Sequence, residues 1–184
     1  MHISPTPLPG LFIITPRRYL DDRGFFVEAY NKRALAAAGI HATFVQDNVS
    51  ASMNVGTLRG LHFQKSPYAQ AKLVSVLKGS ALDVVVDLRR NSPCFGQHFS
   101  IHLTATGGEQ LFVPAGFAHG FITKAEDTIF AYKVSNYYSR EHEAGIHFAD
   151  PILAIQWDIA AENVLLSDRD QALPPFNPEL IYFQ

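Results

Sequence analysis

The chain has 184 residues, 47% of them hydrophobic, and a formal net charge of −2, so one domain with an ample buried core is expected. The charge provides no extended basic field for nucleic acid, the apolar runs fall far short of the roughly 20 residues that cross a bilayer, and the single Cys94 excludes an internal disulfide framework. Because the N-terminus lacks a basic segment followed by an apolar run, we expect a cytoplasmic protein with no nucleic-acid or membrane partner.

The first 44 residues are predicted to form an arm that precedes the main barrel. Leu11–Thr15 and Phe25–Tyr30 have the composition of strands, and they flank a turn at Asp21-Asp22-Arg23-Gly24. Asn31 is expected to cap a short helix that ends before Gly39.

The middle of the chain, roughly residues 45–150, is dominated by short β-strands. Leu73–Leu77 and Ala81–Leu88 are joined by Lys78-Gly79-Ser80, which predicts a hairpin with glycine in the turn. Further strands are predicted at residues 99–104, 110–113, 119–123 and 128–134. Many short strands with turns between them indicate an all-β sandwich or closed barrel.

After Pro151 the pattern loosens, and a helical turn or two is expected within residues 160–166. We treat residues 151–184 as a C-terminal segment of the same domain. The whole chain, residues 1–184, is therefore predicted to be one domain with short peripheral helices.

Two spaced sets of residues resemble the signatures of the cupins, small jelly-roll β-barrels. Gly56, five residues and His62 follow the first signature, but Gln64 and Lys72 stand where that family has a second His and a Glu as metal ligands. The second signature is nearly complete, with its members at Gly108, Pro114, Gly116 and His119 and with Thr123 in place of Asn. An ammonium group repels a cation that a carboxylate would bind, so we expect a cupin jelly roll whose pocket has no metal and no other cofactor.

The residues in that pocket suit proton transfer next to a ketone. Alternate residues of a strand share a face, so His62, Lys72 and Tyr132 converge if their strands line one barrel. An imidazole can take the proton, an ammonium can stabilise the enolate oxygen, and a phenol can return a proton from the other face. Arg59 lies three residues from His62 and would face the other way in a regular strand, unless a bulge at Gly60 changes the parity or Arg59 stands at the end of the strand.

The motifs then resemble one family from nearly end to end, the dTDP-4-dehydrorhamnose 3,5-epimerases. They include Asp22-Arg23-Gly24-Phe25-Phe26, Leu58-Arg59-Gly60-Leu61-His62-Phe63-Gln64, Gln70-Ala71-Lys72-Leu73-Val74, residues 113–121 and Ser167-Asp168-Arg169-Asp170. The resemblance implies isomerase activity that inverts C3 and C5 of dTDP-4-dehydro-6-deoxy-D-glucose, for deoxysugar biosynthesis. It makes His62 the base, Asp170 its carboxylate partner, Tyr132 the acid and Lys72 the group that stabilises the enolate.

The same resemblance implies the residues that bind the nucleotide sugar. Arg23 and Arg59 are assigned to the diphosphate, for which guanidinium forks are well suited, and Tyr138 to the thymine. Further contacts are assigned to Glu28, Gln46, Asn48, His119, Glu143 and Arg169, the last where the family usually has Lys. The family also implies a homodimer in which N-terminal strands cross to the neighbouring subunit.

Other functions stay open at this point. A monofunctional C3- or C5-epimerase of a related dTDP-4-keto sugar would share nearly all these motifs, and a sugar-nucleotide 3,4-ketoisomerase would keep a His base. A metal-dependent cupin needs a ligand that neither Gln64 nor Lys72 provides. A sugar-binding jelly roll explains the aromatic and Arg residues, but it gives no reason for His62, Lys72, Tyr132 and Asp170 to occur together.

Overall fold

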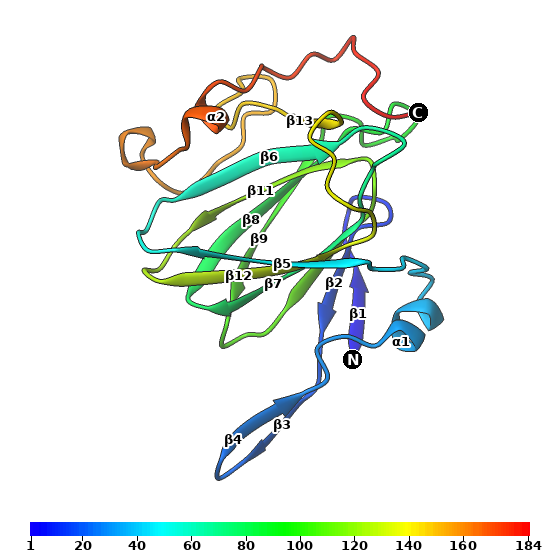
Figure 1. Cartoon of the computed structure of the whole chain (residues 1–184), viewed down its shortest axis with the longest axis vertical. Coiled ribbons are helices and arrows are strands. Elements are labelled where there is room, and N and C mark those ends of the chain that lie inside the picture. The colour runs from blue at the N-terminus through cyan, green and yellow to red at the C-terminus, as the bar shows by residue number, and fades with distance from the viewer.

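Two antiparallel β-sheets face each other in the computed structural model, which describes all residues 1–184 (Figure 1). The six-stranded sheet has the order β1 (His2–Pro5), β2 (Phe12–Thr15), β10 (Gln110–Val113), β7 (Lys72–Lys78), β12 (Thr128–Val134) and β5 (Gln46–Ser52). The five-stranded sheet has the order β13 (Glu143–Gly145), β6 (Leu58–Gln64), β11 (Phe117–Thr123), β8 (Ser80–Asp87) and β9 (His98–Thr104). The predicted all-β jelly roll is confirmed.

The predicted hairpin at Gly79 is wrong, although both of its strands exist. β7 pairs with β10 and β12 in one sheet, whereas β8 pairs with β9 and β11 in the other, so the chain crosses between the sheets at this turn. Gly79 has a φ of +77°, and a Cβ there would lie 2.4 Å from Oγ1 of Thr128. Gly79 therefore determines that the chain turns, while strands far along the sequence determine with which strands β7 and β8 pair.

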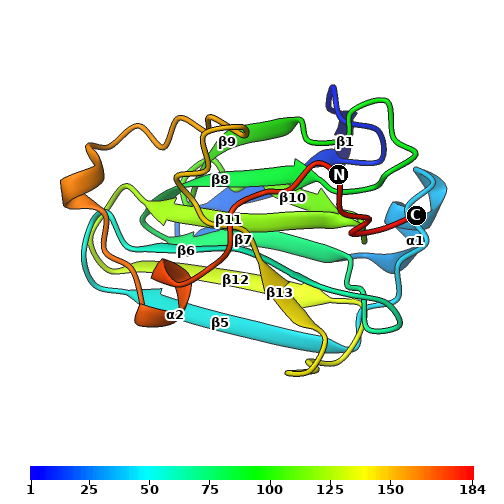
Figure 2. The same cartoon turned by 90° about the horizontal axis from the view of Figure 1, so that it is seen from above.

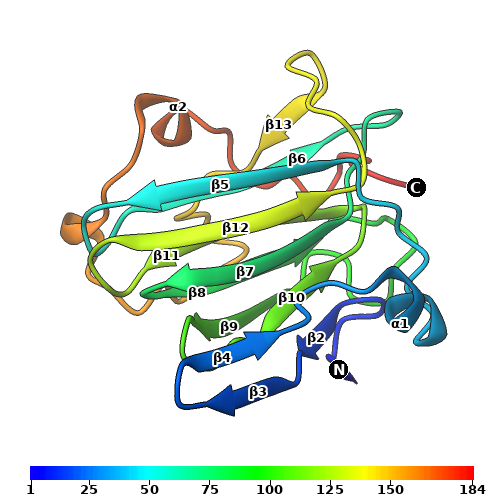
Figure 3. The ribbon, with the colours of Figure 1, turned by 60° about the horizontal axis from the view of Figure 1, so that its bottom comes forward.

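A separate hairpin of β3 (Arg18–Asp21) and β4 (Gly24–Val27) projects from the sandwich. The turn predicted at residues 21–24 is present, but β3 is the strand that pairs with β4, while β2 pairs with β1 and β10. The hairpin and α2 (Asp168–Gln171) lie at opposite ends of the molecule in Figures 1 and 3.

The short helices lie at the periphery, as predicted. α1 (Lys32–Ala37) begins after Asn31, whose side chain accepts a hydrogen bond from the Ala34 backbone N–H, and it ends before Gly39. The helical turn expected at residues 160–166 is a 3₁₀ turn, η1 (Ala161–Asn163).

Apolar side chains form three clusters that explain why some strands do not alternate. Between the sheets, residues of β7, β10 and β12 pack against residues of β8, β9 and β11, including Val74, Phe130, Val85 and Phe121. The C-terminal segment covers the outer face of the five-stranded sheet (Figure 2), and α1 covers part of the outer face of the other sheet. β8 is therefore buried on both faces, which explains why its sequence, apart from Asp83 and the two end residues, is apolar on both faces.

Candidate active site

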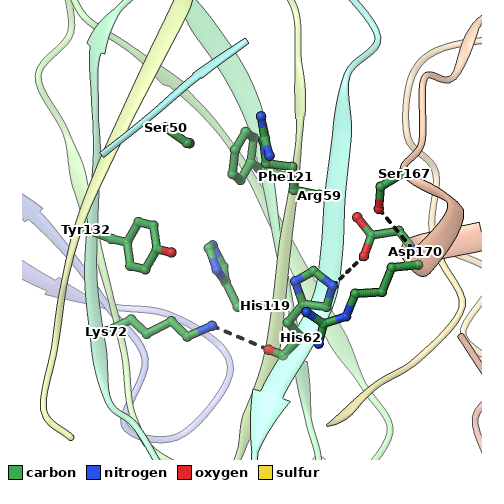
Figure 4. A pocket seen from close by; sticks show the side chains of 10 residues that line it. Ser50, Arg59, His62, Lys72, His119, Phe121, Tyr132, Ser167 and Asp170 are labelled. Atoms are coloured by element: carbon green, nitrogen blue, oxygen red, sulfur yellow. Dashed lines mark hydrogen bonds and ion pairs between the residues drawn. The ribbon is translucent and has the colours of Figure 1, made fainter. Parts of the chain in front are cut away.

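One cavity of about 290 Å³ opens between the two sheets, beside α2 (Figure 4). Six elements contribute to its wall, and residues far apart in the sequence meet there. The lining residues are Ser50, Arg59, His62, Lys72, His119, Phe121, Tyr132, Ser167, Arg169 and Asp170.

An irregularity in β6 brings Arg59 and His62 to the same cavity. His62 pairs with His119 of β11, whereas Arg59 pairs with Phe121, so three steps along β6 match two along β11. This extra residue forms a bulge at Gly60, which is one of the two ways in which the sequence allowed Arg59 to face the cavity. A Cβ at position 60 would lie 2.4 Å from Cα of Gly120, which explains why glycine occupies the bulge.

His62 and Asp170 form a close pair at the cavity wall. His62 Nε2 lies 2.6 Å from Oδ1 of Asp170, and Figure 4 shows the other ring nitrogen, Nδ1, turned toward the cavity. Burial acts to raise the pKa of Asp170, but the hydrogen bonds from His62 and Ser167 outweigh it and hold the pKa below its usual value. The carboxylate therefore fixes the tautomer with hydrogen on Nε2, which leaves Nδ1 free to accept a proton.

The short helix α2 places Asp170 in this pair. Ser167 caps the helix, and its hydroxyl accepts a hydrogen bond of 3.1 Å from the Asp170 backbone N–H. In the sequence, Ser167 was recognised only as part of a motif. The structure shows that it caps the helix that carries Asp170.

Tyr132 and Lys72 face His62 from the six-stranded sheet. Lys72 pairs with Val134 of β12, two residues from Tyr132, so the Lys72 and Tyr132 side chains share one face. Burial lowers the pKa of Lys72 to about 8, against the opposing influence of Asp83 and Glu143, and its Nζ donates a hydrogen bond of 3.4 Å to the His62 carbonyl. Burial raises the pKa of Tyr132, which keeps its phenol protonated at neutral pH. The predicted base and acid thus occupy opposite walls.

His119 belongs to a second histidine–carboxylate pair that sequence reasoning missed. Its Nε2 lies 2.8 Å from Oδ2 of Asp83, a fully buried residue whose Oδ1 has no hydrogen-bond partner. Burial lowers the pKa of His119, although Asp83 opposes the shift, so the imidazole is neutral at pH 7. The sequence contained one signal of this pair, the carboxylate of Asp83 between the apolar residues Leu82 and Val84, because a charged group in a buried strand needs a polar partner.

A second hollow of about 190 Å³ adjoins the first and shares His62, Lys72 and Tyr132 with it. Four predicted binding residues line it, namely Gln46, Asn48, Tyr138 and Glu143. The Tyr138 hydroxyl donates a hydrogen bond to Oε2 of Glu143, which also pairs with Arg169. Burial acts to raise the pKa of Glu143, but these hydrogen bonds outweigh it and lower the pKa.

Arg23 and Glu28 are the two predicted binding residues that lie outside both hollows. Arg23 is exposed at the tip of the β3–β4 hairpin, where it pairs with Asp21. Glu28 accepts a hydrogen bond from Asn31 and faces a different hollow beside Tyr19 and Phe26. The other eleven predicted site residues line the two joined hollows.

The residues at the cupin ligand positions do not fit a metal ion. Lys72 contributes a cation, and the amide of Gln64 is engaged by the backbone of residues 68, 137 and 139. The remaining histidines, His62 and His119, are each paired with a carboxylate. No group of three His, Cys, Asp or Glu side chains comes together in the structure.

This arrangement defines an isomerase of the acid–base type. A histidine paired with a carboxylate faces a half-buried tyrosine across one cavity, and a buried lysine lies beside them, which are the groups that proton transfer next to a carbonyl requires. Arg59 and Arg169 add positive charge to the cavity wall, which suits an anionic substrate.

Known proteins of one family resemble the chain over most of its length. Residues 5–178 match the dTDP-4-dehydrorhamnose 3,5-epimerase family. The Pseudomonas aeruginosa protein of that name is 46% identical over 172 residues, which cover 93% of each chain. The crystal structure of the Bacillus anthracis enzyme with TDP and PPi bound has a TM-score of 0.92 at 47% identity and covers 95% of this chain and 99% of its own.

A structure with a bound sugar nucleotide is similarly close. The Legionella pneumophila dTDP-6-deoxy-D-glucose-3,5-epimerase, in complex with dTDP-4-keto-L-rhamnose, has a TM-score of 0.88 at 44% identity, and the match covers 96% of this chain and 98% of that one. The chain therefore belongs to the dTDP-4-dehydrorhamnose 3,5-epimerase family.

None of the helices has both the length and the hydropathy that a membrane-spanning helix requires.

Proposed function

We propose that the protein converts dTDP-4-dehydro-6-deoxy-D-glucose to dTDP-4-dehydro-L-rhamnose by inverting C3 and C5, as a step of deoxysugar biosynthesis. One observation carries the proposal, which is the placement of His62 on the five-stranded sheet and Tyr132 on the six-stranded sheet, on opposite walls of one cavity. A base and an acid on the same side would return the original configuration. Groups on opposite faces of a sugar ring produce inversion.

The proposed step begins at a carbon next to the C4 ketone. Nδ1 of His62 takes the proton, the C–H electron pair forms the enolate, and the Lys72 ammonium stabilises the negative charge on the C4 oxygen. The Tyr132 hydroxyl then gives its proton to the opposite face of the carbon as the ketone reforms. Exchange of protons with solvent restores neutral His62 and the phenol, and the sequence repeats at the second carbon.

The second hollow is the proposed position of the nucleotide. Tyr138 presents an aromatic face for thymine, and Arg59 and Arg169 offer guanidinium groups to the diphosphate. Gln46, Asn48 and Glu143 supply polar contacts near the nucleotide or sugar, and neutral His119 contacts the sugar region. The two hollows are continuous at His62, Lys72 and Tyr132, so a nucleotide sugar can span them.

A homodimer is the proposed state, because the arm has an uncovered apolar surface. Leu20 is 81% exposed and Phe26 69% exposed, and Tyr19 and Phe25 are also exposed on the same hairpin. Val49 and Leu77 are exposed on the outer face of the six-stranded sheet, beside a groove of about 250 Å³. Patches of this kind mark interaction sites. In a dimer, Arg23 and Glu28 would serve the site of the neighbouring subunit.

A cytoplasmic location is proposed from the substrate, since the reaction needs a supply of nucleotide sugar, and from the unpaired thiol of Cys94.

Heavy water distinguishes this proposal from its rivals. The purified protein is incubated with dTDP-4-dehydro-6-deoxyglucose in deuterium oxide, and the product is analysed by NMR. We expect deuterium at both C3 and C5 of an L-configured product. Deuterium at one carbon alone would indicate a monofunctional epimerase, a product with its carbonyl at C3 would indicate a 3,4-ketoisomerase, and no exchange would overturn the epimerase proposal.

A further inference from the structure

The amide of Gln64 joins the strand that holds the base to the segment that holds Tyr138. Gln64 is buried on β6, two residues beyond His62. Its Nε2 donates hydrogen bonds of 2.7 Å to the Tyr68 carbonyl and 3.0 Å to the Tyr137 carbonyl, and its Oε1 accepts one of 2.6 Å from the Ser139 backbone N–H. One side chain therefore holds the backbone on both sides of Tyr138.

Tyr138 itself projects from this clamped backbone. Its side chain is exposed, and its hydroxyl donates a hydrogen bond to Glu143. Glu143 pairs with Gln64 in register across β13 and β6, and its carboxylate also binds Arg169, the residue next to Asp170. The backbone of Tyr138 is thus fixed by Gln64 and its hydroxyl by Glu143, a residue on the neighbouring strand.

An amide is suited to this position because the three backbone groups need two donors and one acceptor. Glutamine provides both donors on Nε2 and an acceptor on Oε1 within one plane. A glutamate would place two acceptors against two carbonyl oxygens, and an apolar side chain would leave all three backbone groups without their partner.

We propose that Gln64 is a positioning residue for nucleotide binding, which holds the Tyr138 ring ready at the mouth of the site. The inference rests on the proposed function, because it takes Tyr138 as the contact of the thymine base. Fixing an exposed aromatic ring before binding reduces the entropy that is lost when the base stacks on it. Because Gln64 and His62 lie on one strand, the clamp also sets the distance between the nucleotide contact and the base.

The expected effect of removing the clamp is on binding. Gln64→Glu and Gln64→Met are each expected to raise KM for the sugar nucleotide, and Kd for dTDP alone, by about tenfold, with kcat within about threefold of the wild type. Gln156→Met is the control, since the Gln156 amide also donates to a backbone carbonyl, that of Ala154, but lies outside both hollows and the groove on the six-stranded sheet. It is expected to leave KM and Kd unchanged.

A double-mutant cycle with Tyr138→Ala separates positioning from a general structural effect. If Gln64 acts through Tyr138, adding Gln64→Met to Tyr138→Ala raises KM by less than twofold, because the ring that it positions is already gone. Multiplicative effects of the two substitutions on KM would overturn the inference, and so would an unchanged Kd for dTDP in both Gln64 variants. Wild-type protein that shows no isotope exchange would instead refute the proposed function. If one Gln64 variant fails to fold, the other still gives the cycle.

Discussion

The interior of the sandwich and the β3–β4 hairpin both contain predicted site residues. The interior residues lie together around a cavity of the same chain, whereas the hairpin residues do not reach that cavity. In the interior, His62, Asp170, Lys72 and Tyr132 already surround one cavity, and each is buried or half-buried. In the hairpin, Arg23 is fully exposed and pairs only with its neighbour Asp21. The four interior residues therefore meet within one chain, whereas the arm's Arg23 lies outside the cavity of its own chain, which motivates the proposed dimer.

The largest effect is expected at the interior. His62→Ala removes the base and should lower kcat roughly 10³-fold, within the range typical for general base catalysis, and should abolish proton exchange with solvent. His102→Ala is the control, because His102 is an exposed histidine that faces Asp158 on the surface. Steady-state kinetics check both variants, and a His62→Ala enzyme with more than a tenth of wild-type activity would contradict the role of the base.

The arm is tested by mixing two variants that are each impaired at low substrate concentration. Arg23→Ala should raise KM by about 10- to 100-fold, the loss expected for a charged hydrogen bond to phosphate, with kcat little changed. If the hairpin serves the neighbouring subunit, a mixed dimer of His62→Ala and Arg23→Ala chains contains one site with both groups intact. Activity at low substrate concentration should then rise after the chains are exchanged. If mass spectrometry verifies the mixed dimers and their activity does not rise, the arm either acts on the site of its own chain or takes no part in substrate binding.

A smaller effect is expected from pH, because Lys72 in the interior loses its charge at high pH whereas Arg23 on the hairpin keeps its charge. Burial lowers the pKa of Lys72 to about 8, so its ammonium form declines above that pH and kcat/KM should fall about tenfold for each further unit. The pKa of Arg23 is raised by its hydrogen bond with Asp21, so the arm keeps its charge over the same range. A kcat/KM that stays flat to pH 10 would show that the Lys72 charge is not required.

The smallest expected effects are losses of stability on substitution of two glycines, one in the sandwich and one in the hairpin. Gly79 and Gly24 both have positive φ, but a Cβ at Gly79 would meet Thr128, whereas a Cβ at Gly24 meets nothing within 4 Å. Gly24→Ala should cost about 1–2 kcal/mol of conformational strain at most, and Gly79→Ala about 1–3 kcal/mol more from the clash. Chemical denaturation measures both, and equal losses of stability would mean that the Gly79 turn relaxes freely.

Local patterns in the sequence predicted the positions of strands and turns better than they predicted which strands pair with one another. Thr128–Val134 was predicted with its observed bounds, and Asn31 caps α1 as expected, because alternation and capping act within a few residues. The prediction of a hairpin at Gly79 failed because the sheet that each strand joins is decided by pairing with β11 and β12, whose paired residues lie 30 or more positions further along the chain. No local signal carries that information.

The convergence of side chains on one cavity was predictable where the motif residues lie on strands and alternation fixes the face of each residue. His62, Lys72 and Tyr132 converge as expected, and the bulge in β6 resolves the position of Arg59. Asp83 and the role of Gln64 were missed, because their partners are His119 and the backbone of residues 68, 137 and 139. Such contacts depend on how the two sheets and their loops meet.

The central claim is that the base and the acid act from opposite walls, and the Tyr132→Phe enzyme in deuterium oxide tests it most directly. Removing the hydroxyl leaves His62 able to remove a proton and return deuterium to the same face. We predict deuterium in recovered substrate of unchanged configuration, with inverted product reduced at least tenfold. Inverted product formed at the wild-type rate would contradict the claim.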